Sequence, residues 1–490
     1  MRNQGIGSWP ARRARMTPDR VAVSYRGREH TYRELLERVH RLASALGVRR
    51  GDRVAFLGAN QPAMVETFFA AGLLGAVFVP LNTRLAEPEL RFILDDAEAA
   101  VLVLGEERDG AGLPGRHVGG AAYEELVASG SPEPIDEPVS QDDVCLIMYT
   151  SGTTGRPKGA MLTHANLTWN AVNLLVDVPL AHDEVVLISA PMFHIAALAQ
   201  TLIPCVLKGG RAVLEPSFDV ERTYDLIERE RVTVMFGVPS MFGFLTRSPR
   251  WPTADLSSLR HLLCGGAPVP EPLIRTYQER GLTFLQGYGM TETAPGALFL
   301  GAEHSVDKAG SAGVPCFFSD VRLVAPDGSP AAPGQPGELY VQGPNVMRGY
   351  WRRPEETAKV LSEDGWFRSG DVGVADEDGY VRISDRINDV IISGGENIYP
   401  AEVESALYEH PAVAECAVIG VADERWGEVG KALVVLRAGV TTSPDDLLKH
   451  LDGRLARYKI PKYLEFVADL PKNAAGKLLK APLRKLYGGG

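Results

Sequence analysis

The sequence has 490 residues, a length that predicts roughly two to four domains. Hydrophobic residues make up 45% and charged residues 23% of it, which is typical of a globular protein and excludes a collagenous, disordered or coiled-coil chain. The formal net charge of −11 argues against a surface that neutralises nucleic-acid phosphates, so we expect no nucleic-acid partner. The 5 cysteines contain no CxxC pair, which argues against a zinc or dithiol site and predicts buried apolar side chains.

The sequence shows no segment typical of a membrane span or a secretory leader. The longest uncharged run, at 185–207, is interrupted by prolines and polar residues and suits a protein interior better than hydrocarbon. The first residues carry arginines without the apolar stretch of a secretory signal. We therefore expect a cytoplasmic protein without a transmembrane segment. Arg247, Arg250 and Arg260 leave peripheral contact with an anionic membrane open, although scattered arginines are more often solvated.

Strand and helix patterns alternate through the first half of the chain. Thr31 and Glu34 form a capping-box pattern, and apolar residues then recur at helical spacing up to Gly47, which predicts an amphipathic helix. A second helical segment is expected at 89–96. The expected strands lie at 54–57, 76–79, 101–104, 144–148, 184–190, 211–214, 232–236 and 259–264. This alternation predicts a largely parallel sheet flanked by helices.

The remaining sequence changes texture twice. Turns rich in Gly, Pro and acidic residues predict a small β-barrel-like region of short strands. Beyond it, helices starting near Pro400 and Pro444 and strands at 416–421 and 432–436 predict a compact α+β unit. We therefore expect an α/β protein. Its large N-terminal composite domain covers 1–384, a hinge covers 385–389, and a smaller, mobile α+β C-terminal domain covers 390–490.

The string YTSGTTGRPKG at 149–159 follows the expected strand at 144–148. Its glycines leave backbone N–H groups accessible, its hydroxyls add donors, and Lys158 adds a positive charge, a combination that suits a polyphosphate. Its spacing is not that of a Walker loop. A Gly-rich turn between two elements would have a similar composition. The complete string, however, resembles the phosphate-binding signature of the adenylate-forming superfamily, which includes acyl-CoA synthetases, firefly luciferases and non-ribosomal adenylation domains.

The resemblance implies a nucleotide site assembled from several strings. In QGYGMTE at 286–292, it implies that Tyr288 lies against adenine, Thr291 contacts the α-phosphate and Glu292 holds Mg²⁺. In WFRSGD at 366–371, it implies that Asp371 accepts hydrogen bonds from the ribose hydroxyls, with Arg386 nearby. The other implied nucleotide-binding residues are Thr150, Ser151, Gly152, Thr153, Thr154, Gly155, Lys158, Gly265, Gly266, Ala267, Gln286, Gly287 and Gly289.

The same resemblance assigns roles to the C-terminal part of the chain. PKNAAGK at 471–477 is similar to the closing motif whose last lysine, here Lys477, touches the substrate carboxylate and the α-phosphate. Asn388 stands at the hinge, where the family usually has Lys or Asp. The loop expected along the coenzyme A path contains Ser393, Gly394, Gly395 and Glu396. The implied catalytic residues are Lys477, Glu292, Thr150 and His194.

The resemblance, which spans nearly the whole chain and is nearest in texture to actinobacterial fatty-acid-CoA ligases, implies a two-step reaction. ATP, Mg²⁺ and coenzyme A convert a carboxylic acid to acyl-AMP and pyrophosphate, and then to acyl-CoA and AMP. The expected acyl pocket contains His194, Val238, Met241, Gly266, Gly289 and Met290. Its segments carry no cation for a second carboxylate, which favours an apolar monocarboxylic acid.

Among apolar acids, we expect a medium- or long-chain fatty acid first and an aromatic acid as the alternative. Two other hypotheses stay open. One is an adenylating enzyme that loads a carrier protein in place of free CoA. The other is a non-catalytic nucleotide sensor, which would have no need to keep both Glu292 and Lys477.

Overall fold

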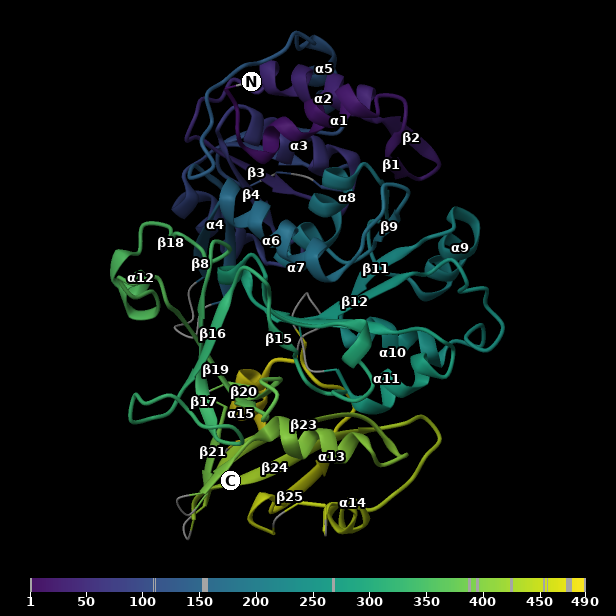
Figure 1. The fold of residues 1–490 in the computed structure, drawn as a ribbon, viewed down its shortest axis with the longest axis vertical. Coiled ribbons are helices and arrows are strands. Elements are labelled where there is room, and N and C mark those ends of the chain that lie inside the picture. The colour runs from purple at the N-terminus through teal and green to yellow at the C-terminus, as the bar shows by residue number, and fades with distance from the viewer. Residues whose placement is uncertain are drawn as a thin grey trace.

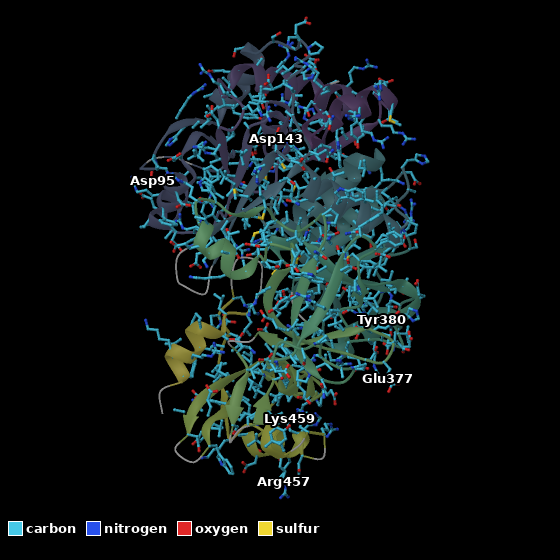
Figure 2. All side chains as sticks on the ribbon, turned by 60° about the vertical axis from the view of Figure 1, so that its left-hand side comes forward. Asp95, Asp143, Glu377, Tyr380, Arg457 and Lys459 are labelled. Carbon is cyan, nitrogen blue, oxygen red and sulfur yellow. The ribbon has the colours of Figure 1, made fainter. Side chains whose placement is uncertain are left out.

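The computed structural model describes residues 2–108, 110, 112–151, 157–266, 269–386, 389–393, 396–423, 426–452, 454–455, 457–472 and 478–488. For residues 151, 385, 386, 392, 396 and 397 the backbone alone is described. The molecule is elongated, with the N-terminal elements at one end of its long axis and the elements from β21 onward at the other (Figure 1). The same separation is visible in Figure 2, where Arg457 and Lys459 lie at the opposite end of the molecule from Asp143.

A seven-stranded sheet in the described residues carries the first group of site residues. Its order is β18-β8-β7-β4-β3-β5-β6, and the pairs from β7 to β6 are parallel. The bounds are β3 (Arg53–Leu57), β4 (Val77–Leu81), β5 (Ala99–Leu104), β6 (Arg116–Gly119), β7 (Val144–Ser151), β8 (Pro157–Thr163) and β18 (Gly349–Tyr350). Every residue of β4 is buried, and its sequence is continuously apolar. Such a sequence is expected because helices cover both faces of a parallel sheet.

A nine-stranded sheet in the described residues carries the second group. Its order is β15-β14-β13-β12-β11-β9-β10-β1-β2. The bounds are β1 (Val21–Tyr25), β2 (Arg28–Thr31), β9 (Val185–Ile188), β10 (Arg211–Leu214), β11 (Val234–Gly237), β12 (His261–Gly265), β13 (Phe284–Gly289), β14 (Gly296–Leu300) and β15 (Val314–Pro315). In this order, each pair of neighbours from β13 to β1 is parallel. The expected parallel α/β architecture is therefore confirmed.

Helices flank both sheets. Those of the large unit are α1 (Trp9–Met16), α2 (Tyr32–Ala45), α3 (Pro62–Leu73), α4 (Glu87–Ala97), α5 (Ala121–Ser129), α6 (His164–Asp177), α7 (Ile195–Ala197), α8 (Ile203–Lys208), α9 (Val220–Glu230), α10 (Pro239–Arg247), α11 (Glu271–Gln278) and α12 (Pro354–Val360). The expected capping box is confirmed at α2, where the Thr31 hydroxyl accepts from the Glu34 N–H at 3.2 Å and Glu34 accepts from the Thr31 N–H at 2.7 Å.

The third sheet corresponds to the expected barrel-like region, but its described strands form an open antiparallel sheet. Its order is β16-β17-β19-β20, with bounds β16 (Asp320–Val324), β17 (Pro336–Gln342), β19 (Phe367–Ala375) and β20 (Val381–Arg386). Strands β16 and β20 are the outer members of that order and do not pair with each other in the described residues. The barrel expectation is therefore corrected to a small open sheet.

The C-terminal elements form an α+β unit with its own core. Its strands are β21 (Ile391–Ser393), β22 (Glu396–Ile398), β23 (Val413–Asp423), β24 (Gly427–Leu436) and β25 (Tyr463–Phe466), and its helices are α13 (Pro400–Tyr408), α14 (Pro444–Leu451) and α15 (Lys480–Tyr487). Two apolar clusters, formed only by residues from Ile391 onward, fill the space between these elements. The division at 385–389 stays a prediction.

The structure shows how the five cysteines are buried and which partners the arginines considered for membrane contact have. All five cysteines are buried and free, as expected for small apolar side chains. Arg250 pairs with Asp225 at 2.7 Å and with Glu228 at 3.0 Å, and Arg260 pairs with Asp183 at 3.1 Å. Arg250 and Arg260 are therefore paired with acidic side chains, whereas Arg247 donates to the Ala414 carbonyl oxygen at 3.5 Å. Contact with an anionic membrane stays a prediction. In the described residues, no helix is long and apolar enough to cross a membrane.

Candidate active site

Strands β7 and β8 flank the glycine-rich string. They pair in antiparallel register, which sets Thr150 opposite Lys158 and Ser151 opposite Pro157. Gly152, Thr153, Thr154 and Gly155 lie outside the described residues, as does the side chain of Ser151. The two ends of the expected phosphate-binding string are therefore held next to each other by ladder hydrogen bonds of one sheet.

Lys158 faces two residues that the sequence analysis did not single out. Its ammonium lies 2.6 Å from a Glu356 carboxylate oxygen and 5.4 Å from the centre of the Tyr350 ring. The Lys158 side chain is only 16% exposed, so this ion pair is largely shielded from solvent. Nothing in the string GYWRRPEET at 349–357 signals chemistry by itself, because a carboxylate in the first turn of a helix is common.

Tyr350 also joins Lys158 to the expected metal ligand. Its hydroxyl donates to Glu292 Oε1 at 2.8 Å, and Glu292 is buried within the short turn Thr291–Thr293. Burial, followed by the negative charge of Glu292, raises the pKa of Tyr350, so the phenol stays protonated and able to donate. Strand β18 pairs Tyr350 with Ala160 on β8, two residues beyond Lys158. The structure thus brings the string at 149–159 and Glu292 together.

The expected adenine and ribose residues also meet. The Tyr288 hydroxyl, at the end of β13, donates to Asp371 Oδ2 at 2.7 Å. Asp371 lies on β19, where its register partner on β20 is Arg386. The side chain of Arg386 lies outside the described residues. Tyr288 and Asp371 come from two different sheets, and their hydrogen bond brings the expected adenine residue and the expected ribose residue together. Their roles at a nucleoside stay predictions.

Two of the expected nucleotide-binding glycines are required by strand packing. A Cβ on Gly265 would lie 2.7 Å from the Gly287 carbonyl oxygen, and one on Gly289 would lie 1.6 Å from the Pro295 carbonyl oxygen. Backbone contact therefore suffices to explain glycine at these positions, without any ligand. At Gly287, by contrast, the nearest atom to an added Cβ is 3.8 Å away. Ala267 lies outside the described residues.

His194 stands at the start of α7 with its Nε2 buried and without a partner in the described chain. Burial lowers its pKa to about 4, and the positive charge of Arg84 acts in the same direction. The ring is therefore neutral at physiological pH and can either donate or accept a hydrogen bond.

The other expected pocket residues lie at neighbouring strand ends. Val238 precedes α10, Met241 is buried within its first turn, and Val238 Cγ1 lies 3.6 Å from where a Cβ of Gly266 would stand. Met290 caps the turn that carries Glu292. Because these residues follow parallel strands of the nine-stranded sheet, they meet at its carboxyl edge, where ligands of α/β proteins commonly bind.

A residue missed by the sequence analysis, Gln200, extends this apolar region. It lies in a π-helical turn, Leu198–Leu202, between α7 and α8, a geometry that is frequent at functional sites. Its Oε1 is buried without a partner in the described chain, and its Nε2 lies 3.7 Å from where a Cβ of Gly296 would stand. A single sequence gave no signal for the π turn, because local composition there is that of an ordinary apolar helix.

Most of the expected C-terminal site residues cannot be placed. Lys477, Asn388, Gly394 and Gly395 lie outside the described residues, as does the side chain of Glu396. Ser393 pairs with Glu396 in the β21–β22 hairpin and with Gly427 on β24. Arg247 Nη2 of the large unit donates to the Ala414 carbonyl oxygen of the C-terminal unit at 3.5 Å. The expected roles of these residues stay predictions.

The described residues contain no cluster of three or more histidine, cysteine or acidic side chains suited to a metal. A site with one carboxylate agrees with Mg²⁺ chemistry, since Mg²⁺ keeps several waters and binds through one or two carboxylates plus substrate phosphates. Glu292, buried and oriented by the Tyr350 hydroxyl, fits that arrangement beside Lys158.

Comparison with known proteins identifies the family. Residues 10–351 match the AMP-binding enzyme model, and residues 402–477 match the AMP-binding enzyme C-terminal domain. A feruloyl-CoA synthase of Amycolatopsis is 57% identical, with 100% of each chain covered. The long-chain-fatty-acid–CoA ligase FadD13 of Mycobacterium tuberculosis is 39% identical, with 93% of each covered.

A solved structure is similar over almost the whole chain. It is the o-succinylbenzoate CoA synthetase of Bacillus subtilis in complex with its acyl-adenylate intermediate, with 37% identity, a TM-score of 0.89 and coverage of 97% of this chain and 98% of that one. The chain therefore belongs to the AMP-binding enzyme family and is an acyl-CoA synthetase, an acid–thiol ligase that uses ATP, Mg²⁺ and CoA.

Proposed function

We propose that this acyl-CoA synthetase activates an aromatic monocarboxylic acid of the hydroxycinnamate type. The observation that carries the proposal is the full-length identity of 57% to a feruloyl-CoA synthase, against 39% to a fatty-acid ligase. The medium- or long-chain fatty acid expected from the sequence is not confirmed, and the aromatic alternative fits the comparisons better. The cytoplasmic location stays a prediction.

Two buried polar atoms support an acid with a polar substituent. His194 Nε2 and Gln200 Oε1 have no partner in the described chain, and leaving such a group unpaired costs about 1 to 3 kcal/mol. An alkyl chain would leave both unpaired, whereas a hydroxylated aromatic ring supplies a donor and acceptors. The Gln200 carboxamide can turn either end towards the ligand, because its oxygen and nitrogen are exchangeable by rotation.

The first half-reaction joins the acid to AMP. A carboxylate oxygen forms a bond to the α-phosphorus of ATP, and the bond from that phosphorus to the pyrophosphate oxygen breaks. In the proposed arrangement Lys158 holds the β- and γ-phosphates, Thr291 contacts the α-phosphate, Asp371 binds the ribose, and Lys477 approaches the carboxylate. Mg²⁺ at Glu292 would supply positive charge that offsets the phosphates. Catalysis here depends on positioning and charge stabilisation.

The second half-reaction transfers the acyl group to CoA. The thiol sulfur bonds to the acyl carbon, the bond from that carbon to the AMP oxygen breaks, and the thiol proton leaves to solvent. The C-terminal unit carries both Lys477 and the 393–396 loop, so it would present them in turn by rotating about the hinge.

The proposal is tested by steady-state kinetics with ATP, Mg²⁺ and free CoA across ferulate, cinnamate, octanoate, palmitate and malonate. We expect kcat/KM for ferulate to exceed that for octanoate by at least about tenfold, which is the value of one satisfied buried hydrogen bond. A preference for octanoate or palmitate would overturn the aromatic assignment. Formation of acyl-AMP without any CoA thioester would instead favour loading of a carrier protein.

A further inference from the structure

Glu356 is a carboxylate with a 26% exposed side chain that belongs to none of the strings compared with the family above. It lies in the first turn of α12, where the N–H ends of a helix favour a negative charge. One of its oxygens lies 2.6 Å from Lys158 Nζ, and the other lies 2.6 Å from Lys359 Nζ. Hydrogen bonds from Lys158 and then Lys359 lower the pKa of Glu356 to about 2, so it is ionised at any working pH.

The backbone around Glu356 leaves its position little freedom. The Tyr350 N–H donates to Thr357 Oγ1 at 2.9 Å, which ties α12 to β18, and the Trp351 N–H donates to the Gly159 carbonyl at 2.7 Å, which ties β18 to β8. Glu356 and Lys158 are thus held on one framework. The framework also includes Glu292, because Tyr350 donates to it.

The pair has a consequence for ligands that carry β- and γ-phosphates. In the structure, Glu356 offers Lys158 the negatively charged oxygen that a phosphate would offer in a complex. An incoming polyphosphate must displace this carboxylate or share the ammonium with it at close range, and either event costs electrostatic free energy. AMP and acyl-AMP lack those phosphates and do not meet this cost.

We propose that Glu356 is a positioning residue that pairs with Lys158, competes with the β- and γ-phosphates for its ammonium, and thereby weakens pyrophosphate binding and favours pyrophosphate release. The proposal rests on the proposed phosphate-binding role of Lys158, but not on the identity of the acid. It predicts that removal of the Glu356 charge affects pyrophosphate and leaves AMP unaffected, a split that loss of folding alone would not produce.

The test is equilibrium titration of the full chain by calorimetry, with magnesium pyrophosphate and separately with AMP, in the absence of acid and CoA. The variant is Glu356→Gln, which keeps the shape of the side chain. Its matched control is Glu355→Gln, which removes an equal charge from the exposed neighbour on the same helix. We expect Glu356→Gln to bind pyrophosphate about tenfold more tightly, and Glu355→Gln to change it less than about twofold. AMP affinity should change less than about twofold in both.

Three results would overturn the proposal. The first is unchanged or weaker pyrophosphate binding by Glu356→Gln, and the second is equal tightening in both variants, which would indicate a general charge effect. The third is binding of AMP but of no pyrophosphate by both the wild type and Glu356→Gln; it would remove the role of Lys158 while leaving the acid preference to be judged by the kinetic panel. If Glu356→Gln does not fold, Glu356→Asp carries the test, because the shorter side chain draws the charge away from Lys158 and should tighten pyrophosphate binding in the same direction.

Discussion

Around Lys158 the described charged side chains pair with one another, whereas around His194 and Gln200 buried polar atoms have no partner in the described chain. Lys158, Glu356, Tyr350 and Glu292 form a continuous series of contacts. At the acyl end, His194 Nε2 and Gln200 Oε1 are buried and unpaired. Gln286, an expected nucleotide-binding residue, also has a buried Nε2 without a partner in the described chain. The contrast is therefore between the paired charges around Lys158 and the two unpaired atoms at the expected acyl end, which we expect the substrate to complete.

The largest expected effect tests whether the nucleotide end can form acyl-AMP without Lys477 of the C-terminal unit. Lys477→Ala should slow formation of acyl-AMP by about 10²- to 10³-fold, because one charge contact to the reacting groups is lost. Thioester formation from pre-made acyl-AMP should stay within a few-fold, since that step would use another face of the C-terminal unit. Single-turnover assays of the two half-reactions provide the measurement.

The control for Lys477 is another lysine of the same string. Lys472 forms an ion pair with Glu415 at 2.6 Å, so Lys472→Ala tests the loss of a nearby positive charge with a structural partner. Its adenylation rate should stay within a few-fold of wild type. An equal fall of both half-reactions in Lys477→Ala would refute the two-conformation account.

The next prediction concerns how the free energy of unfolding depends on pH, and it tests whether the fold keeps His194, at the expected acyl end, neutral. Burial lowers the pKa of both His164 and His194 to about 4, whereas an unfolded histidine titrates near 6.5. Between these values the unfolded chain binds more protons, so the free energy of unfolding falls as the pH drops from about 6.5 to about 4, by about 3 kcal/mol for each histidine. Below that window the contribution is lost completely and the dependence levels off.

Urea unfolding at several pH values between 7.5 and 4 measures this dependence. His194→Gln should reduce the acid loss by about one histidine's share, about 3 kcal/mol. His182→Gln, at an exposed position, should leave it unchanged. If the free energy of unfolding fell equally with pH in wild type and His194→Gln, the fold would not hold His194 neutral.

The smallest expected effect tests the unpaired carboxamide. Gln200→Leu should lower kcat/KM for ferulate by about tenfold, because a buried hydrogen bond to the ring hydroxyl is lost. Cinnamate, which lacks both the hydroxyl and the methoxy group of ferulate, is the control substrate and should react as well as before or better. If the ratio of ferulate to cinnamate kcat/KM did not change, Gln200 would not contact the substituted ring.

Sequence patterns predicted the elements that depend on local rules. The capping box at Thr31 and the alternating strands were found because caps and hydrophobic runs are local. The short edge strands β2 and β18 were missed, since such strands carry little periodicity of their own, and so was β1, which lies between β10 and β2. The barrel expectation was wrong in detail, because turn composition indicates short antiparallel strands without indicating whether the outer ones meet.

The candidate site was only partly visible for a related reason. Strings such as that at 149–159 were recognisable because the complete string resembles a known family signature, whereas its composition alone also fits a Gly-rich turn. Tyr350, Glu356 and Gln200 became visible only through contacts between distant segments, which no single sequence displays. Two glycines, Gly265 and Gly289, were attributed to the ligand although neighbouring backbone already requires them. Composition alone does not separate those two causes.

The most direct test of the central claim is a competition reaction. Purified enzyme is given ATP, Mg²⁺, CoA and equal concentrations of ferulate and octanoate, and mass spectrometry measures the two CoA thioesters at low conversion, so that their ratio equals the ratio of kcat/KM. The account predicts a feruloyl thioester in excess of at least about tenfold. An excess of the octanoyl thioester would contradict it.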